Sequence, residues 1–178
     1  EALVKTGKPV VLLLANGRPM VLSWESANVP AIMDIWFPGS EAGNAICDVI
    51  FGDKAPVGHL TTTFPQHAGQ VPIYYNHKNT GRPIGENDYG KYTSGYLDVT
   101  NAPQYPFGYG LTYTTFALSE ITLNAESITA DGVLEASVVV KNTGDREGTA
   151  LVQCYTHDLA ASVTRPVQEL KAFQHVTL

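Results

Sequence analysis

The sequence predicts an α/β region, the end of an α/β sandwich domain with a parallel sheet, followed by an all-β region that begins a β-sandwich. Residues 10–14 are a continuous apolar run, which is typical of a strand buried on both faces of a parallel sheet. Residues 133–141 instead alternate apolar and polar side chains with a period of two, which is typical of a half-buried antiparallel strand. We therefore expect two domains, residues 1–112 and residues 113–178.

The elements of the first region follow in order. Residues 1–5 and the glycine at position 7 have the pattern of the last turn of a helix, so the chain is expected to begin inside an element of a longer protein. After the strand at 10–14, Asn16-Gly17 turns the chain, and residues 19–24 predict either a second strand or the second arm of a hairpin.

A helix is expected after Ser40, which is a suitable N-cap, with Glu41 in a first turn that favours negative charge. Its apolar side chains recur at helical spacing, and Gly52 ends it: Ala42, Ala45, Ile46, Val49 and Ile50. Residues 31–36 are predicted as buried structure before it, and residues 60–64 as a short strand after it.

Residues 65–103 are rich in Gly, Pro, Asn and Tyr and show little periodicity. A loop this long within a compact domain is commonly functional. The segment is therefore the one part of the chain that we expect to reach a ligand.

The second region offers four or five strands, at residues 117–124, 133–141, 149–156 and 170–176. A complete sandwich of the immunoglobulin or fibronectin kind needs about seven strands in roughly 100 residues. The sandwich is therefore expected to be incomplete in these residues.

The two regions meet at Tyr105-Pro-Phe-Gly-Tyr-Gly-Leu-Thr-Tyr-Thr-Thr-Phe116, which we call the seam. Pro106, Gly108 and Gly110 exclude a regular helix there and favour an extended path. The aromatic side chains predict either tight packing between two bodies or a ligand platform.

Composition excludes several classes of partner and site. A formal charge of −6, with 11 Lys and Arg spread along the chain, argues against nucleic acid, and no apolar run approaches the roughly 20 residues needed for membrane insertion. Cys47 and Cys154 are too few for a disulfide framework and are expected to be unpaired and buried. The five His show no metal-ligand spacing, Glu86, Asp88 and Asp98 lack a calcium-loop pattern, and no glycine motif suits a phosphate, so no metal and no cofactor is expected.

The seam and four further segments resemble glycoside hydrolase family 3, and the resemblance covers nearly the whole chain in one order. The other segments are Trp36-Phe-Pro-Gly-Ser-Glu-Ala-Gly-Asn-Ala-Ile-Cys-Asp-Val-Ile-Phe-Gly-Asp53, Val71-Pro-Ile-Tyr-Tyr-Asn-His-Lys-Asn-Thr-Gly-Arg-Pro83, Lys91-Tyr-Thr-Ser94 and Thr164-Arg-Pro-Val-Gln-Glu-Leu-Lys171. The resemblance implies the C-terminal part of a bacterial β-glucosidase, with a fibronectin type III-like domain after the seam. It also implies a periplasmic or secreted location, with the cytoplasm as the alternative.

The resemblance further implies a retaining, exo-acting enzyme that removes terminal non-reducing β-D-glucosyl residues. Its nucleophilic aspartate would lie in an N-terminal barrel and its acid/base glutamate in the upstream part of the α/β domain, both before residue 1. No carboxylate here sits in a matching catalytic motif, so no catalytic residue is assigned among Glu25, Asp34, Glu41, Asp48 and Asp53. The segment alone is expected to be inactive without the barrel and the upstream domain.

Four residues are candidates for contact with a β-glucoside or oligosaccharide substrate. His77 and Arg82 could donate hydrogen bonds to sugar hydroxyls, and Trp36 and Tyr92 could stack on a pyranose face. The alternative is that they brace the loop and pack the domains together. Other functions also remain open: a non-catalytic carbohydrate-binding or adhesion module, or a parent enzyme that is a β-xylosidase or a β-N-acetylglucosaminidase.

Overall fold

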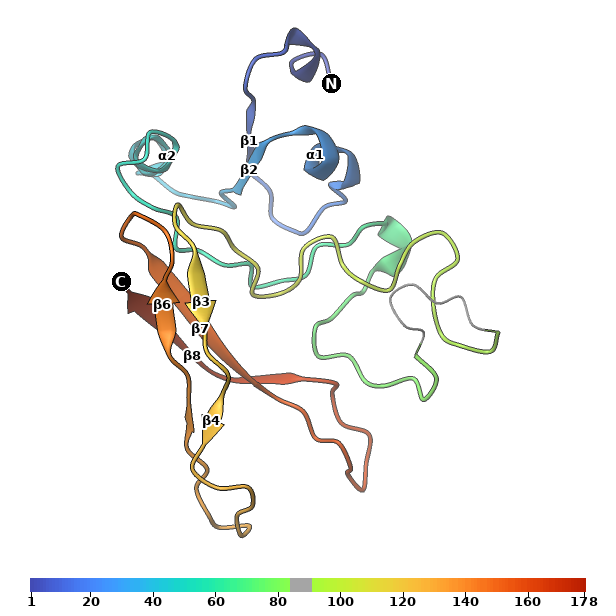
Figure 1. Cartoon of the computed structure of the whole chain (residues 1–178). Coiled ribbons are helices and arrows are strands. Elements are labelled where there is room, and N and C mark those ends of the chain that lie inside the picture. The colour runs from blue at the N-terminus through green and yellow to red at the C-terminus, as the bar shows by residue number, and fades with distance from the viewer. Residues whose placement is uncertain (84–90) are drawn as a thin grey trace.

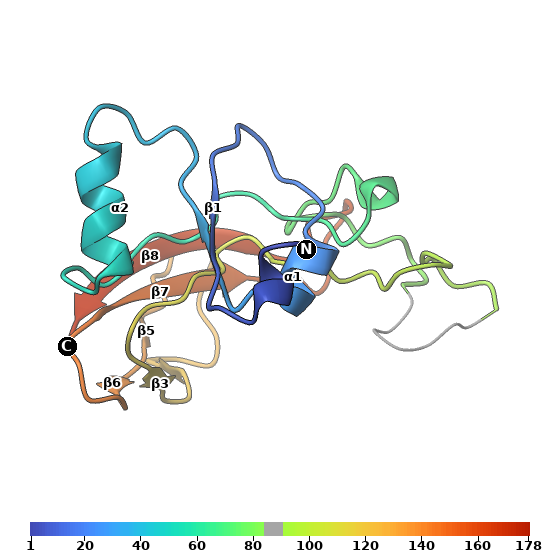
Figure 2. The same cartoon turned by 90° about the horizontal axis from the view of Figure 1, so that it is seen from above.

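The computed structural model describes residues 1–83 and 91–178 (Figure 1). A small α/β part lies above a set of antiparallel strands, and the seam runs between them. Figures 1 and 2 place helix α2 and the C-terminus on one side of the molecule and the long loop on the other.

The α/β part contains the expected parallel pair. Strand β1 (Val11–Leu14) pairs with β2 (Ala31–Asp34), and helix α1 (Ser23–Asn28) forms the crossover that parallel strands require. Helix α2 (Ala42–Ile50) follows, and Gly52 takes a positive φ of 82° just beyond its end. Within the described residues the parallel sheet has only the two strands β1 and β2. The expected α/β region is therefore present, but the expected sandwich around a parallel sheet is not.

Three local expectations are corrected. The segment expected as a strand or hairpin arm at 19–24 instead leads into helix α1, since the chain must cross over to return parallel. The N-cap of α2 is Glu41 rather than Ser40, and its carboxylate accepts from the Asn44 side chain at 2.7 Å. The first residues form a single 3-10 turn, η1 (Val4–Thr6), closed by Gly7 at a φ of 71°.

The segment expected as a strand at 60–64 is not a regular strand. It follows the seam through separate backbone hydrogen bonds, including Leu60 N–H to Tyr109 O at 2.8 Å and Phe64 N–H to Tyr105 O at 2.9 Å. Phe64 is 1% exposed and forms the hydrophobic core with Leu14 and Leu22. The seam therefore completes the core of the first region.

The second region consists of antiparallel pairs. The longest joins β7 (Thr149–Thr156) to β8 (Glu169–Thr177), with an irregularity between Cys154 and Tyr155. The expected strand at 117–124 is divided into β3 (Phe116–Leu118) and β4 (Thr122–Leu123), which pair with β6 (Val140–Asn142) and β5 (Ala136–Ser137) respectively. The expected strands at 149–156 and 170–176 correspond to β7 and β8.

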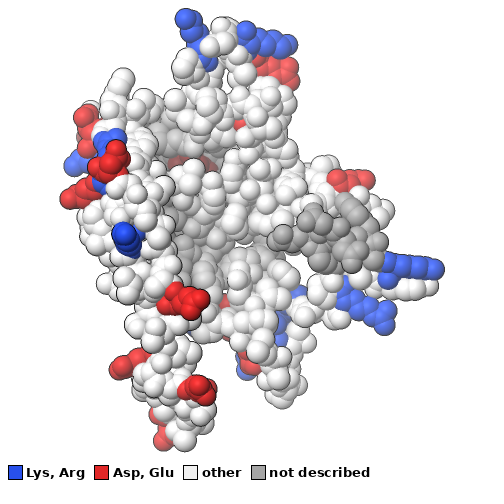
Figure 3. Space-filling model, in the orientation of Figure 1, with Lys and Arg blue, Asp and Glu red and all other residues white. Residues whose placement is uncertain are grey.

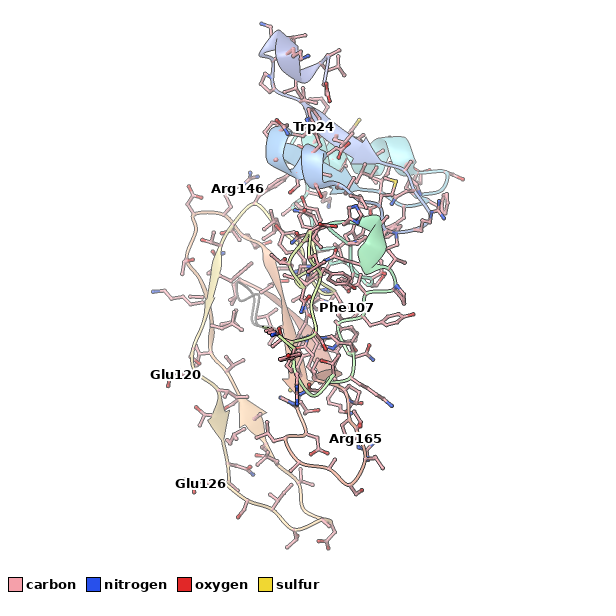
Figure 4. The ribbon with its side chains drawn as sticks, turned by 90° about the vertical axis from the view of Figure 1, so that its right-hand side faces the viewer. Trp24, Phe107, Glu120, Glu126, Arg146 and Arg165 are labelled. Carbon is pink, nitrogen blue, oxygen red and sulfur yellow. The ribbon has the colours of Figure 1, made fainter. Side chains whose placement is uncertain are left out.

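The second region also supplies polar partners to the end of helix α2. The Tyr113 hydroxyl donates to the Val49 carbonyl, and Arg146 Nη2 donates to the Gly52 carbonyl at 3.1 Å while its guanidinium lies 5.7 Å from the Tyr113 ring centroid. Figure 4 shows Arg146 at the end of the strands nearest the helices. A cation and a hydroxyl at a helix C-terminus satisfy carbonyls that the helix itself leaves unpaired.

Both cysteines are free, as expected, but Cys47 on α2 is exposed and Cys154 on β7 is half-buried, so the expectation of burial is wrong for Cys47.

None of the described helices is long and apolar enough to cross a membrane. On the face shown in Figure 3, acidic and basic side chains are scattered at the margins around a largely uncharged centre.

Candidate functional site

The two ends of the long loop are joined by the side chain of Gln70, which is 1% exposed and ends the 3-10 turn η2 (Ala68–Gln70). Its Oε1 accepts from the backbone N–H groups of Gln66 and His67 at 2.7 and 3.2 Å. Its Nε2 donates to the carbonyls of Thr100 and Ala102 at 2.9 and 3.1 Å. One buried amide therefore joins the two ends of the loop, and a fully paired buried group of this kind rigidifies its surroundings.

A second closure joins the two sides of the loop further out. The Arg82 carbonyl accepts from the Ser94 N–H at 2.7 Å, and Pro83 and Ser94 form an isolated parallel bridge. The Asn101 side chain then donates to the Ser94 carbonyl at 3.1 Å. This neck pairs the backbone at the candidate Arg82 with that of Ser94, two residues after the candidate Tyr92.

Tyr92 is 74% exposed, and its backbone has a φ of 69°. The left-handed region is unfavourable for a bulky side chain, and such residues occur more often at binding and active sites than elsewhere. Lys91 Nζ lies 5.1 Å from the centroid of its ring, within the range of a cation–π contact. The ring is thus presented to solvent rather than packed into the core.

Trp36 also has a left-handed backbone, with a φ of 46°, but its surroundings differ. Its backbone N–H donates to Asp34 Oδ1 at 3.0 Å. The centroid of its ring lies 6.0 Å from that of Phe64, and the ring packs against the core. The contacts therefore place Trp36 in the α/β scaffold, whereas Arg82 and Tyr92 lie on the loop.

His77 is exposed and its backbone is tied to the second region. Its carbonyl accepts from the Val167 N–H at 2.9 Å, and its Nδ1 lies 3.1 Å from the Lys78 carbonyl.

Two polar residues lie at the carboxyl ends of the parallel strands, where open α/β sheets bind ligands. Burial raises the pKa of the Asp34 carboxyl, against the opposing effects of the Trp36 N–H and the Asn16 side chain. In the described part of the chain, Asp34 Oδ2 and Asn16 Oδ1 are buried acceptors without a hydrogen-bond donor. The sequence identified Asn16 only as a turn residue, and the apolar run directly before it was the signal that it lies at a strand end.

Residues 1–83 and 91–178 contain no group of three or more His, Cys, Asp or Glu side chains that could hold a metal ion. Glu86 and Asp88, which were considered for a calcium loop, lie outside the described residues.

Comparison with known families gives two matches. Residues 1–113 match the glycosyl hydrolase family 3 C-terminal domain, and residues 150–178 match the fibronectin type III-like domain. The chain belongs to glycosyl hydrolase family 3. The resemblance inferred from the seam and the four further segments is thereby confirmed for this family 3 chain.

Individual relatives agree. A "Periplasmic beta-glucosidase" of Salmonella typhimurium is 52% identical over 99% of this chain, and a "Beta-xylosidase" of Formosa agariphila is 43% identical over all of it. The solved structure of a beta-glucosidase from Listeria innocua in complex with isofagomine superposes with a TM-score of 0.93 at 43% identity, covering 99% of this chain. The chain spans 23% of the Salmonella protein, 24% of the Formosa protein and 25% of the Listeria chain.

Proposed function

We propose that this chain is the C-terminal portion of a retaining, exo-acting β-glucosidase that hydrolyses terminal non-reducing β-D-glucosyl residues. The observation that carries the proposal is the 52% identity, over 99% of the chain, to a protein named as a periplasmic β-glucosidase. Glycoside hydrolysis by retention needs two carboxyl groups about 5 Å apart. We assign that pair to the upstream barrel and α/β domain, and to these 178 residues the role of scaffold and cleft wall.

Within that wall we propose that Arg82 and Tyr92 contact the sugar, because they share one neck and Tyr92 presents an exposed ring on a left-handed backbone. A ring of this kind suits the apolar face of a pyranose, and a guanidinium donates hydrogen bonds to hydroxyls. His77 is proposed as a further donor. Trp36 is proposed to shape the cleft from the scaffold side, because its ring packs on Phe64.

The test uses the full-length parent enzyme and the 178-residue segment, each with p-nitrophenyl β-D-glucopyranoside. We expect turnover by the parent alone. Replacing Tyr92 by Leu in the parent should raise KM about five- to tenfold, the value of one lost stacking contact, with kcat little changed. Tyr74→Leu is the matched control, since Tyr74 is an exposed tyrosine of the same loop that is not a candidate.

Turnover by the isolated segment would contradict the assignment of the catalytic pair to upstream residues. A parent without glycosidase activity but with affinity for oligosaccharides would favour the non-catalytic binding module instead.

A β-xylosidase is the second candidate, because two Formosa agariphila relatives at 43% and 35% identity carry that name or "Putative beta-xylosidase". A β-glucoside differs from a β-xyloside by the C6 hydroxymethyl group of the sugar. The ratio of kcat/KM for p-nitrophenyl β-D-glucopyranoside and β-D-xylopyranoside in the parent enzyme decides between them.

We also propose that the parent protein is periplasmic or secreted, on the name of the Salmonella relative. Cell fractionation of the source bacterium tests the location.

The domain boundary is proposed to fall between residues 112 and 113. Separate changes in hydrogen-exchange protection for residues 1–112 and 113–178 in urea would support the boundary, and one shared transition would contradict it.

A further inference from the structure

Three aromatic side chains from three parts of the chain meet beside the long loop. The ring of Tyr75, on the loop, stacks on that of Phe107, on the seam, with centroids 4.2 Å apart and an interplanar angle of 17°. The same Tyr75 ring meets the edge of Tyr155, on strand β7, at 5.9 Å and 74°. We call Tyr75, Phe107 and Tyr155 the aromatic clamp, and Figure 4 shows Phe107 between the loop and the strands.

Polar contacts fix the orientation of the clamp. The Tyr155 hydroxyl donates to Gln153 Oε1, and Gln153 Nε2 donates to the Gly108 carbonyl at 3.0 Å. Gly108 has a φ of 80°, and a Cβ at this position would overlap the Gln153 side chain. Strand β7 therefore packs directly against the backbone of the seam at Gly108, where only a glycine leaves room for the Gln153 side chain.

The backbone of the loop is tied to the second region as well. Lys78 and Pro166 form an antiparallel bridge, and the Val167 N–H donates to the His77 carbonyl at 2.9 Å. Residues 166–167 belong to the connection that leads from β7 to β8. The loop thus has one anchor where its own two ends join, at Gln70, and a second in the fibronectin type III-like region.

The second anchor is the closer one, along the chain, to the proposed sugar-contacting residues. His77 is two residues from Tyr75, and the neck at Arg82 and Ser94 follows directly. Gln70 in contrast joins the ends of the loop, where no candidate lies. A displaced clamp would move the candidates without removing any of them.

From these contacts we propose that the fibronectin type III-like region positions the substrate loop, and that Tyr75 and Tyr155 are positioning residues for sugar binding. This inference rests on the proposed function of Arg82 and Tyr92 at the neck. The second region then contributes to substrate affinity without touching the substrate. Because the clamp acts through loop position, its loss should alter KM and leave kcat nearly unchanged.

The test uses the full-length parent enzyme with Tyr155 replaced by Leu or by Phe. We expect Tyr155→Leu to raise KM about fivefold with kcat changed less than twofold, and to increase amide hydrogen exchange in residues 72–83 and 91–97. Tyr155→Phe keeps the edge contact with Tyr75 and should restore most of the affinity, because ring packing is the dominant contact. Tyr75→Leu removes the same ring contact from the loop side, away from β7, and should reproduce Tyr155→Leu. A Tyr75→Leu variant without the effect would mean that Tyr155→Leu acts by disturbing β7, and Tyr74→Leu is the control.

The outcomes separate this inference from the proposed function. Unchanged exchange in the loop of both Leu variants would overturn the clamp. Increased amide exchange in the loop with an unchanged KM, in the Tyr75 and Tyr155 variants, would overturn the positioning role. The KM of Tyr92→Leu, measured in the same experiment, then shows whether the loop contacts the sugar. An inactive parent with increased exchange would refute the proposed function while leaving the clamp as a purely structural contact.

Discussion

The two regions of this molecule are stabilised by different interactions. The first buries Leu14, Leu22 and Phe64 around a two-stranded sheet, whereas Ala150 is the buried apolar residue of the described part after the seam. The second region instead pairs β7 with β8 over nearly their whole lengths. The first region should therefore depend on individual core side chains, and the second should tolerate side-chain loss because its backbone ladder persists.

The largest effect is expected from removing the ring at the centre of the first core. Phe64→Ala in the 178-residue chain should destabilise the first region by about 3–5 kcal/mol, because the cavity is enclosed by the core and the seam. A loss of this size is a large fraction of the stability of a small domain. Urea unfolding followed by tryptophan fluorescence measures it, since Trp24 and Trp36 both lie in this region.

The control is Phe37→Ala, whose ring is 80% exposed, with an expected change within about 0.5 kcal/mol. Equal losses for Phe64 and Phe37 would contradict the view that one core side chain governs the first region.

A somewhat smaller effect is expected at Gln70, which joins the ends of the loop through four side-chain hydrogen bonds. In Gln70→Met the two N–H groups and two carbonyls that the amide serves lose their partners, at a total cost of about 3 kcal/mol after partial relaxation toward water. Hydrogen exchange should rise first at the Gln66 and His67 amides, whereas the β7–β8 ladder should keep its protection.

Gln168→Met serves as the control, because Gln168 is exposed. Loss of protection along β7 and β8 in the Gln70 variant would show that the two regions unfold as one unit, against the comparison drawn here.

The smallest effect is expected at Asp34, and its sign depends on pH. Because the folded pKa lies above the ordinary value of 3.8, the folded state loses stability as pH rises through the interval between these two values, and the full penalty is present at neutral pH. Asp34→Asn keeps the oxygen that accepts from the Trp36 backbone N–H and removes the charge whose burial raises the pKa.

The Tm of Asp34→Asn should be about 1–2 °C higher than that of the unchanged chain at neutral pH, and the gain should be smaller below pH 3.8. The gain is small because nearby solvent screens the carboxylate. Thermal unfolding of both proteins at the two pH values measures the difference. A lower Tm for the variant at neutral pH would mean that the charged carboxylate has a partner that stabilises it.

The order of elements could be predicted from local sequence patterns alone. The apolar run at 10–14, the periodicity after Ser40 and the alternation after the seam predicted β1, α2 and several of the later strands, because local spacing encodes which face is buried. The sequence also predicted the family, since the seam and four further segments occur in one order. It could not predict that residues before α1 form no strand, because Asn16-Gly17 suits a hairpin and a crossover equally well.

The arrangement of the candidate site depends on contacts between segments that are far apart in the sequence. Arg82 and Tyr92 belong to one neck because the Ser94 N–H donates to the Arg82 carbonyl, whereas the Trp36 ring packs on Phe64 in the scaffold. Gln70 and the aromatic clamp join residues up to 80 positions apart, such as Tyr75 and Tyr155, and no local pattern marks them. Hydrogen bonds and ring contacts between distant segments depend on the chain path as a whole, and sequence periodicity records only which side of each element faces inward.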